Sequence, residues 1–169
     1  KICFKNHLLY SIITLMAIAM LFPITAFAQA YVQTWDLVDS GKHLDYDGNS
    51  TYMSYINTGA ATWNAYKSGV IRKDSAFVVE DVYVSDVNAS NGWAGMTYSS
   101  GKIELNTYYM SGYSNSKKQN VATHELGHAL GLDHSTSTDV MDAAITGHTS
   151  TQALSQNDKD SYDAAYNNY

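Results

Sequence analysis

The side chains of this sequence that could perform chemistry gather in the segment from His124 to His134, which reads HELGHALGLDH. On a helix, residues four apart lie on one face, so His124 and His128 can direct two imidazoles at one metal ion. Glu125 lies about 100° further round the axis and can reach the open side of that metal. Gly131 can adopt a positive φ and end the helix, so that the chain turns back and His134 becomes a third ligand. Three protein ligands leave a fourth position for water, which predicts a catalytic zinc site.

A histidine-rich helix in a satisfied core is the alternative interpretation of this segment. Chance seldom places a glutamate, a glycine and a third histidine at these spacings together, so the metal site is the favoured interpretation. Three apolar residues lie on other faces of the same helix and are predicted to be core contacts: Leu126, Ala129 and Leu130.

The segment and its surroundings resemble the metzincin metallopeptidases, and within them the matrixins. The resemblance implies a methionine turn beneath the zinc, and Val140-Met141-Asp142 lies where that turn is expected, with Met141 as its methionine. A serine directly after the third histidine, here Ser135, is a further feature that resembles matrixins. The implied fold is α+β and zincin-like, with a twisted mixed β-sheet, an active-site helix, the methionine turn and a C-terminal helix. An edge strand of this sheet is expected to border the cleft.

The start of the expected C-terminal helix carries a further likeness to matrixins, in Leu154-Ser155-Gln156-Asn157-Asp158. Ser155 is a suitable N-cap and Asp158 follows it by three residues, which approximates a capping box. Helical spacing continues in the tail through Tyr162, Ala165, Tyr166 and Tyr169. The specific resemblance thus extends from Asn120 to the C-terminus.

Departures from the matrixin pattern concern the pocket rather than the zinc. The loop from His134 to Met141 is about one residue shorter than a matrixin's, and Asp142-Ala143 replaces the aromatic residue and proline that usually follow the methionine. A propeptide cysteine and the extra histidines of a second zinc site are not visible in the sequence. The remaining histidines are scattered and are predicted to be surface or loop residues: His7, His43 and His148.

Upstream of the zinc segment, the sequence predicts a helix and then a strand. An apolar stripe at helical spacing predicts an amphipathic helix over about 51–67 that ends at Gly69. The stripe is expected to face the core and consists of Met53, Ile56, Ala60 and Trp63. The β-forming residues of 76–84 predict a strand.

A hairpin is predicted next, with arms at 94–99 and 102–109 around Ser100-Gly101. Asn120 is expected to cap the zinc helix. The segment 92–99 is the candidate edge strand, and an ordinary hairpin arm is the alternative for it. An extended peptide could add to such an edge as one more strand, with its scissile carbonyl over the metal.

Two acidic groups could bind calcium. Asp45-Tyr46-Asp47-Gly48-Asn49 alternates oxygen-bearing side chains around a glycine, and Asp86, Asn88 and Asn91 form the second group. Neither has the ligand run of an EF-hand, and the same residue types are common in turns. Plain turns are therefore favoured, and Ca²⁺ is kept as a second candidate cofactor beside one catalytic Zn²⁺.

The first residues have the pattern of a secretory signal peptide. Lys1 and Lys5 precede an apolar run, and Ala26-Phe27-Ala28 offers the small residues that a signal peptidase recognises. Cleavage after Ala28 divides the chain into a signal peptide at 1–28 and a catalytic domain at 29–169, and an uncleaved membrane anchor is the alternative. The only cysteine, Cys3, would leave with the leader, so the mature protein would hold no disulfide.

Charge and length restrict the partners. The formal net charge of −6 becomes −8 once Lys1 and Lys5 leave, and this acidic balance argues against nucleic acid or an anionic membrane as the main partner. Residues 29–169 are enough for one domain with a core and too few for two. We expect a monomer whose partner is a polypeptide substrate.

The sequence therefore predicts a secreted, extracellular zinc endopeptidase in which Glu125 is the general base of hydrolysis by a zinc-activated water. A catalytically inactive zinc-containing binding module is one alternative, although it would not need Glu125. A zinc hydrolase of small amides is the other.

Overall fold

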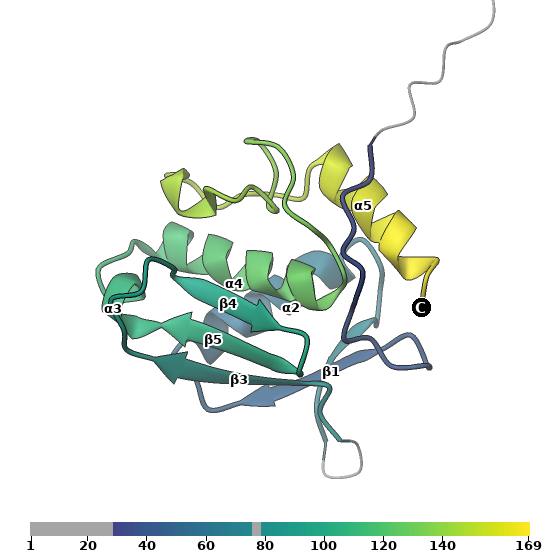
Figure 1. Cartoon of the computed structure of the whole chain (residues 1–169), viewed down its shortest axis with the longest axis horizontal. Helices are drawn as coiled ribbons and strands as arrows, with labels where there is room; N and C mark the ends of the chain where they lie inside the picture. The colour runs from purple at the N-terminus through teal and green to yellow at the C-terminus, as the bar shows by residue number, and fades with distance from the viewer. Residues whose placement is uncertain (1–28, 76–78) are drawn as a thin grey trace, which may run out of the picture.

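A computed structural model describes residues 29–75 and 79–169, which form one sheet with helices packed against it (Figure 1). The strands are β1 (Leu44–Gly48), β2 (Ile71–Lys73), β3 (Val82–Val87), β4 (Gly95–Tyr98) and β5 (Lys102–Asn106). The helices are α2 (Met53–Asn64), α3 (Thr107–Met110), α4 (Asn115–Ala129), the 3₁₀ helix η1 (Ile145–Gly147) and α5 (Gln156–Tyr166). The predicted α+β class is confirmed.

The sheet is mixed, as predicted, and has the order β2-β1-β3-β5-β4. All neighbours are parallel except β4 and β5, which form the predicted antiparallel hairpin. Its second arm, expected to reach residue 109, ends at Asn106, because Asn106 caps the short helix α3 that follows. Strand β3 buries Val82 and Val84 while Tyr83 between them is exposed, so one face of the sheet packs on the helices. Strand β4 forms the edge of the sheet and runs alongside α4 (Figure 1).

The predicted first helix is confirmed as α2, which is shorter at both ends than expected. Its stripe faces the core, since Ile56, Ala60 and Trp63 are buried. The strand expected at 76–84 begins later, at Val82, because pairing with β1 starts there, opposite Tyr46. Val79 is 83% exposed and precedes the strand, and 76–78 lie outside the described residues.

Residues 45–48, expected to form a turn, belong instead to the buried strand β1 between β2 and β3. Arg72 lies directly opposite Asp45 on β2, and its Nε and Nη2 donate to that carboxylate at 2.9 and 2.6 Å. This pairing allows an aspartate to be buried in a central strand. A Cβ at Gly48 would lie 2.1 Å from the Val84 carbonyl oxygen, so only glycine permits this approach of β1 to β3.

The helix that carries the histidines starts five residues before the expected Asn120 cap. Ser114 caps it and accepts a hydrogen bond from the Lys117 N–H. Asn120 is buried inside the helix, where its side chain donates to the Ser150 carbonyl and accepts from the Gln152 N–H. It therefore ties α4 to the segment that leads into α5.

The C-terminal helix has the predicted capping box. The Ser155 hydroxyl accepts from the Asp158 N–H at 3.0 Å, and the Asp158 carboxylate accepts from the Ser155 N–H at 2.8 Å. Tyr162 of this helix packs edge-on against Trp63 of α2, with ring centroids 5.5 Å apart. The predicted core residues Leu126 and Ala129 of α4, and Leu130 directly after it, are fully buried.

The sequence-predicted signal peptide at 1–28 lies outside the described residues. Among the residues that the structure describes, no helix has the length and apolar character needed to cross a membrane.

Candidate metal centre and cleft

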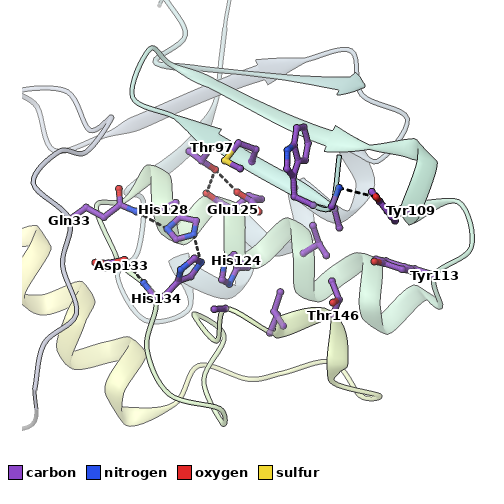
Figure 2. A pocket seen from close by; sticks show the side chains of 18 residues that line it. Gln33, Thr97, Tyr109, Tyr113, His124, Glu125, His128, Asp133, His134 and Thr146 are labelled. Atoms are coloured by element: carbon purple, nitrogen blue, oxygen red, sulfur yellow. Dashed lines mark hydrogen bonds between the residues drawn. The ribbon is translucent and has the colours of Figure 1, made fainter. Parts of the chain in front are cut away.

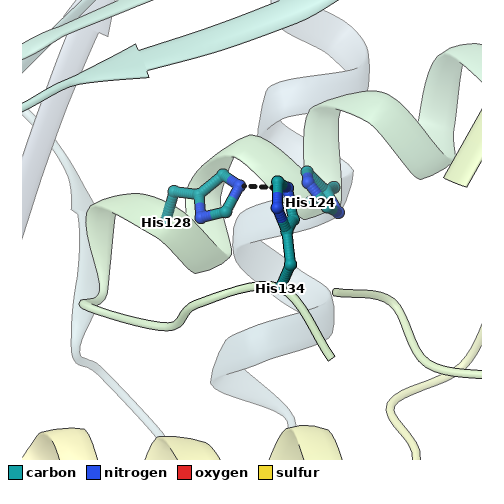
Figure 3. A group of neighbouring side chains, drawn as sticks. All are labelled: His124, His128 and His134. Carbon is teal, nitrogen blue, oxygen red and sulfur yellow. Dashed lines mark hydrogen bonds between the residues drawn. The ribbon is translucent and has the colours of Figure 1, made fainter. Parts of the chain in front are cut away.

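Helix α4 and the turn after it bring the three predicted histidines together (Figure 3). His124 and His128 lie one helical turn apart, and Gly131 has a φ of 84° that reverses the chain. His134 then approaches from the following loop, and one nitrogen from each ring lies within 4.8 Å of the others. The histidine cluster is therefore formed by one helix, one glycine and one loop.

Hydrogen bonds to backbone carbonyls determine which ring nitrogen of His124 and of His128 is available to a metal ion. The Nδ1 of His124 lies 2.8 Å from the Val140 carbonyl oxygen, and the Nδ1 of His128 lies 2.8 Å from that of Leu132. Because a carbonyl can only accept, each Nδ1 carries the hydrogen and each Nε2 keeps a lone pair. The Nε2 of His128 lies 3.2 Å from the Nε2 of His134, so these lone pairs converge.

Burial keeps the first two imidazoles neutral. Burial, together with the unfavourable effect of a second imidazole at His128, lowers the pKa of His124 to about 3. Burial likewise lowers the pKa of His128 to about 4. Both rings are therefore uncharged at neutral pH, which is the form that binds a metal.

The N-terminal segment supports the loop that carries the third histidine. Gln33 N–H donates to the Gly131 carbonyl at 2.7 Å, and Asp133 N–H donates to that of Tyr31 at 2.9 Å. The Gln33 side-chain amide also lies 2.9 Å from the Nδ1 of His128, while its Oε1 is buried without a partner among the described residues. Exchanging the two ends of this amide would let Oε1 accept from the same N–H. No local sequence pattern identified this residue.

Residues Val140 and Met141 lie beneath the histidine helix and are held there by α5. The fully buried Asp158 carboxylate accepts from the N–H groups of Val140 and Met141 at 2.9 and 3.1 Å. A Cβ at Gly127 would lie 2.3 Å from the Met141 sulfur and 2.9 Å from a ring carbon of Trp63. Only a glycine in the middle of the motif allows these two side chains to pack under α4.

The side chain of Glu125 extends from α4 towards the edge strand β4 and is buried between the two. Its Oε2 accepts a hydrogen bond from the Thr97 hydroxyl at 2.7 Å. Burial raises the pKa of Glu125 to about 7, and the hydrogen bond from Thr97 opposes the rise. Sequence reasoning missed Thr97 as a site residue, because its contact joins positions 28 residues apart.

The three histidines, Glu125 and Thr97 line an open cleft of about 470 Å³ (Figure 2). One side is β4, which we call the strand wall, and the other is formed by residues 142–148, which we call the loop wall. Gln33 and Asp133 lie at one end of the cleft, and Tyr109 and Tyr113 lie at the other (Figure 2). The cleft could therefore hold a chain that passes the histidines from end to end.

The loop wall is held through the side chain of Asp142. Its Oδ1 accepts from the Ala144 N–H at 2.9 Å, and its Oδ2 lies 2.8 Å from the Nε2 of His148. Ala143, Ile145 and Thr146 of this wall line the cleft. His148 is a loop residue, as predicted, and it pairs with Asp142. His43 lies near Asp39 on the surface, and His7 is outside the described residues.

Within residues 29–75 and 79–169, the structure gives no support to a calcium site. Asp86 accepts from the hydroxyl groups of Ser50 and Thr51 at 2.5 and 2.7 Å, and Asn91 accepts from the Asn106 amide at 2.9 Å. Asp39, Asp45 and Asp81 lie close together, but Arg72 binds the Asp45 carboxylate through two hydrogen bonds. Asp39 accepts from the Gly41 N–H and Asp81 from the Asp45 N–H, both at 2.8 Å, so these carboxylates are engaged with protein donors.

Comparisons with known proteins agree with this site. A family model described as matrixin matches residues 25–167. The chain is similar to the structure of archaemetzincin from Methanopyrus kandleri, with 12% identity, a TM-score of 0.54, and coverage of 77% of this chain and 99% of that one. It also matches high choriolytic enzyme 1, a hatching-enzyme zinc protease from Oryzias latipes, with 17% identity, a TM-score of 0.34, and coverage of 67% and 54%. A search of the curated proteins finds no match.

The mixed sheet with a helix behind its edge has the fold of that archaemetzincin, and the match to the matrixin model identifies a zinc metallopeptidase of the metzincin type, in agreement with the clustered histidines. Since the family model spans most of its length, the chain belongs to the matrixin family. The family resemblance predicted from the sequence is confirmed.

Proposed function

We propose that this chain is an exported zinc endopeptidase that hydrolyses extended polypeptides, with His124, His128 and His134 as zinc ligands and Glu125 as general base. One observation carries the proposal: ring nitrogens of the three histidines lie within 4.8 Å of one another, and the buried Glu125 lies beside them in an open cleft. Met141, packed beneath Gly127, is proposed as the methionine of the family's turn.

The donors fit zinc. Imidazole nitrogens are preferred zinc ligands, and those of His124 and His128 are oriented by carbonyl groups behind them, as in many zinc sites. Three ligands leave a coordination position for water or substrate. When bound, zinc supplies the polarisation of a water molecule and of the peptide carbonyl.

The protein's own contribution to the reaction is the movement of one proton. Among the described residues, the Oε2 of Glu125 is occupied by Thr97, which leaves Oε1 to accept a proton from the attacking water. The pKa of about 7 suits a group that takes up this proton and then gives it to the leaving amine nitrogen. The carboxylate thus serves as base and then as acid.

The strand wall explains why a peptide is the proposed substrate. Strand β4 pairs with β5 on one side only, so its outer main-chain groups remain available at the edge of the described sheet. An extended peptide could pair there as a further strand and lie along the cleft past Glu125. Small amides could not use this edge, which favours polypeptides.

Three variants test the roles of these groups. Glu125→Gln is expected to retain zinc and fold while peptide cleavage falls by about 10²–10⁴. His128→Ala should lose zinc as well as activity, because it removes a ligand. Glu104→Gln, on β5, is the matched control and should cleave at the wild-type rate. Zinc content by elemental analysis, thermal melting and casein cleavage are measured for each.

The outcomes separate the three functions. Wild-type cleavage by Glu125→Gln would refute the proposed base. Protein that holds zinc and cleaves neither casein nor small amides would be a binding module, and cleavage of small amides alone would indicate the other hydrolase. A reproducible zinc content of two per chain would mean that a second site exists.

Export is proposed on the sequence pattern alone. The secreted form should begin at Gln29 and lack a thiol, because Ala26-Phe27-Ala28 offers the cleavage site. Mass spectrometry of the culture supernatant tests this, and Cys3 in the exported protein would refute the cleavage.

A further inference from the structure

The edge strand makes a contact with the proposed base that its role in substrate pairing does not require. The Thr97 hydroxyl lies 2.7 Å from the Oε2 of Glu125 and 2.9 Å from the backbone carbonyl oxygen of the same residue (Figure 2). Both residues are buried. One hydroxyl of β4 therefore contacts both the main chain of α4 and the end of the Glu125 side chain.

A glutamate needs such a contact to be held in one orientation. Its side chain has several rotatable bonds, and ordering it costs conformational entropy that a fixed contact must offset. Among the described residues, Thr97 is the side chain that donates to this carboxylate. The single hydrogen of the Thr97 hydroxyl is shared between this carboxylate and the main-chain carbonyl oxygen of Glu125, so the hydroxyl is held against both α4 and the Glu125 side chain.

Gly95 provides the space in which the carboxylate lies. It is two residues before Thr97 and so projects from the same face of β4. A Cβ at Gly95 would lie 2.5 Å from the Oε1 and 2.7 Å from the Cγ of Glu125, closer than real contacts allow. The carboxylate occupies the volume that any other residue of β4 would fill with its own side chain.

We propose that Thr97 is a positioning residue for Glu125: its hydroxyl, together with the gap at Gly95, holds the carboxylate in one orientation against β4, beside the histidines. This inference rests on the proposed function, because it concerns the orientation of the proposed base. Strand β4 then has two roles: its outer edge can pair with the substrate, and Thr97 on it orients the Glu125 carboxylate that transfers the proton. The position of the substrate and that of the base are thereby set by one element.

Two substitutions at Thr97 separate the hydroxyl from the shape of the side chain. Thr97→Val replaces the hydroxyl with a methyl group of similar volume, and its kcat for peptide cleavage should fall between about tenfold and a hundredfold with KM within about twofold. Thr97→Ser keeps the hydroxyl and should stay within about threefold of wild type. Thr62→Val is the matched control, because Thr62 on α2 donates to the Thr58 carbonyl far from the cleft.

Crystal structures of the same variants test the orientation without depending on cleavage. Glu125 should keep its orientation in Thr97→Ser and turn away from position 97 in Thr97→Val, while zinc content remains that of wild type. Should Thr97→Val not fold, Thr97→Ala removes the hydroxyl without adding a methyl group and takes its place.

Three results would overturn the proposal: wild-type kcat in Thr97→Val, a loss in Thr97→Ser as large as that in Thr97→Val, or an unmoved Glu125 carboxylate in Thr97→Val. A wild-type protein that cleaves no peptide would instead refute the proposed function. The crystallographic comparison would still decide whether Thr97 orients Glu125.

Discussion

The two walls of the cleft face the same histidines but are built by different forces. The strand wall, β4, is fixed by main-chain pairing with β5 and by the bond from Thr97 to Glu125. The loop wall, residues 142–148, has one short 3₁₀ helix and depends on hydrogen bonds to the Asp142 side chain. Main-chain pairing specifies position regardless of side chains, whereas a loop held by a side chain can change with a few substitutions.

The difference explains how one chain can vary its pocket without disturbing its metal site. Val140 and Met141 immediately precede the loop wall, yet they are anchored separately by Asp158 of α5. Changes at Asp142 or beyond need not reach the Val140 carbonyl that orients His124. The departures from the matrixin pattern after Met141 fall in the wall that tolerates them.

The largest expected effect comes from weakening the contact by which Asp158 holds Val140 and Met141 beneath the histidine helix. Asp158→Asn replaces an acceptor-only carboxylate, which receives N–H groups from Val140, Met141 and Ser155, by an amide that can accept at one end alone. We expect unfolding to become easier by about 3 kcal/mol and zinc binding to weaken. Urea unfolding and zinc titration measure the two effects.

Asp160→Asn is the control for that contact. Asp160 is on the same helix, and among the described residues its side chain accepts a hydrogen bond from the exposed Gln156 alone. Stability and zinc affinity should match wild type. If Asp158→Asn lowers stability but leaves zinc affinity unchanged, the contact of Asp158 with Val140 and Met141 stabilises the fold without affecting the histidines.

The next effect compares a matched glycine in each wall. Gly95→Ala places a methyl group against Glu125 and should lower kcat/KM for peptides by at least about tenfold. Gly147→Ala in the loop wall meets no atom within 4 Å and should behave as wild type. Peptide kinetics and melting temperatures of the two variants are compared. Equal losses would show that the walls do not differ as described.

A smaller effect is expected from loosening the loop wall. His148→Ala removes one of the two partners of Asp142 and should raise KM for peptides by a few fold, with kcat and zinc content unchanged. A changed profile of cleavage sites on a peptide mixture would accompany the rise. A fall in kcat with constant KM would instead mean that this wall orients the reacting groups.

The same contrast separates what the sequence predicted from what it could not. The spacing of His124, His128 and Gly131 is local and belongs to one helix and its end, so the clustering of the histidines and the turn could be predicted residue by residue. The capping box at Ser155 is local in the same way. Nothing near Thr97 in the sequence shows that it lies opposite Glu125, because the pairing of strands and helices over long separations decides it.

Strand β1 was misinterpreted for the related reason that its local residues favour another structure. Asp45, Asp47 and Gly48 are typical of turns, but β2 and β3 pair on both sides of them. Arg72 on β2 neutralises Asp45, and Val84 on β3 requires Gly48. The tertiary contacts therefore override the local preference.

The smallest effect is a pH dependence confined to the loop wall. Burial by itself would raise the pKa of Asp142, but the Ala144 N–H and His148 outweigh it, so the pKa lies below its usual value. A carboxyl group with a lowered pKa in the folded state stabilises that state above its unfolded pKa of about 3.9, and the contribution is lost as pH falls through the folded value. Asp142→Asn should thus be less stable than wild type at pH 7, and the difference should vanish at lower pH. Urea unfolding of both proteins, kept in chelator so that zinc release does not enter the comparison, measures this. A difference that stays constant down to about pH 2 would mean that the shape of the Asp142 side chain, rather than its charge, holds the loop wall.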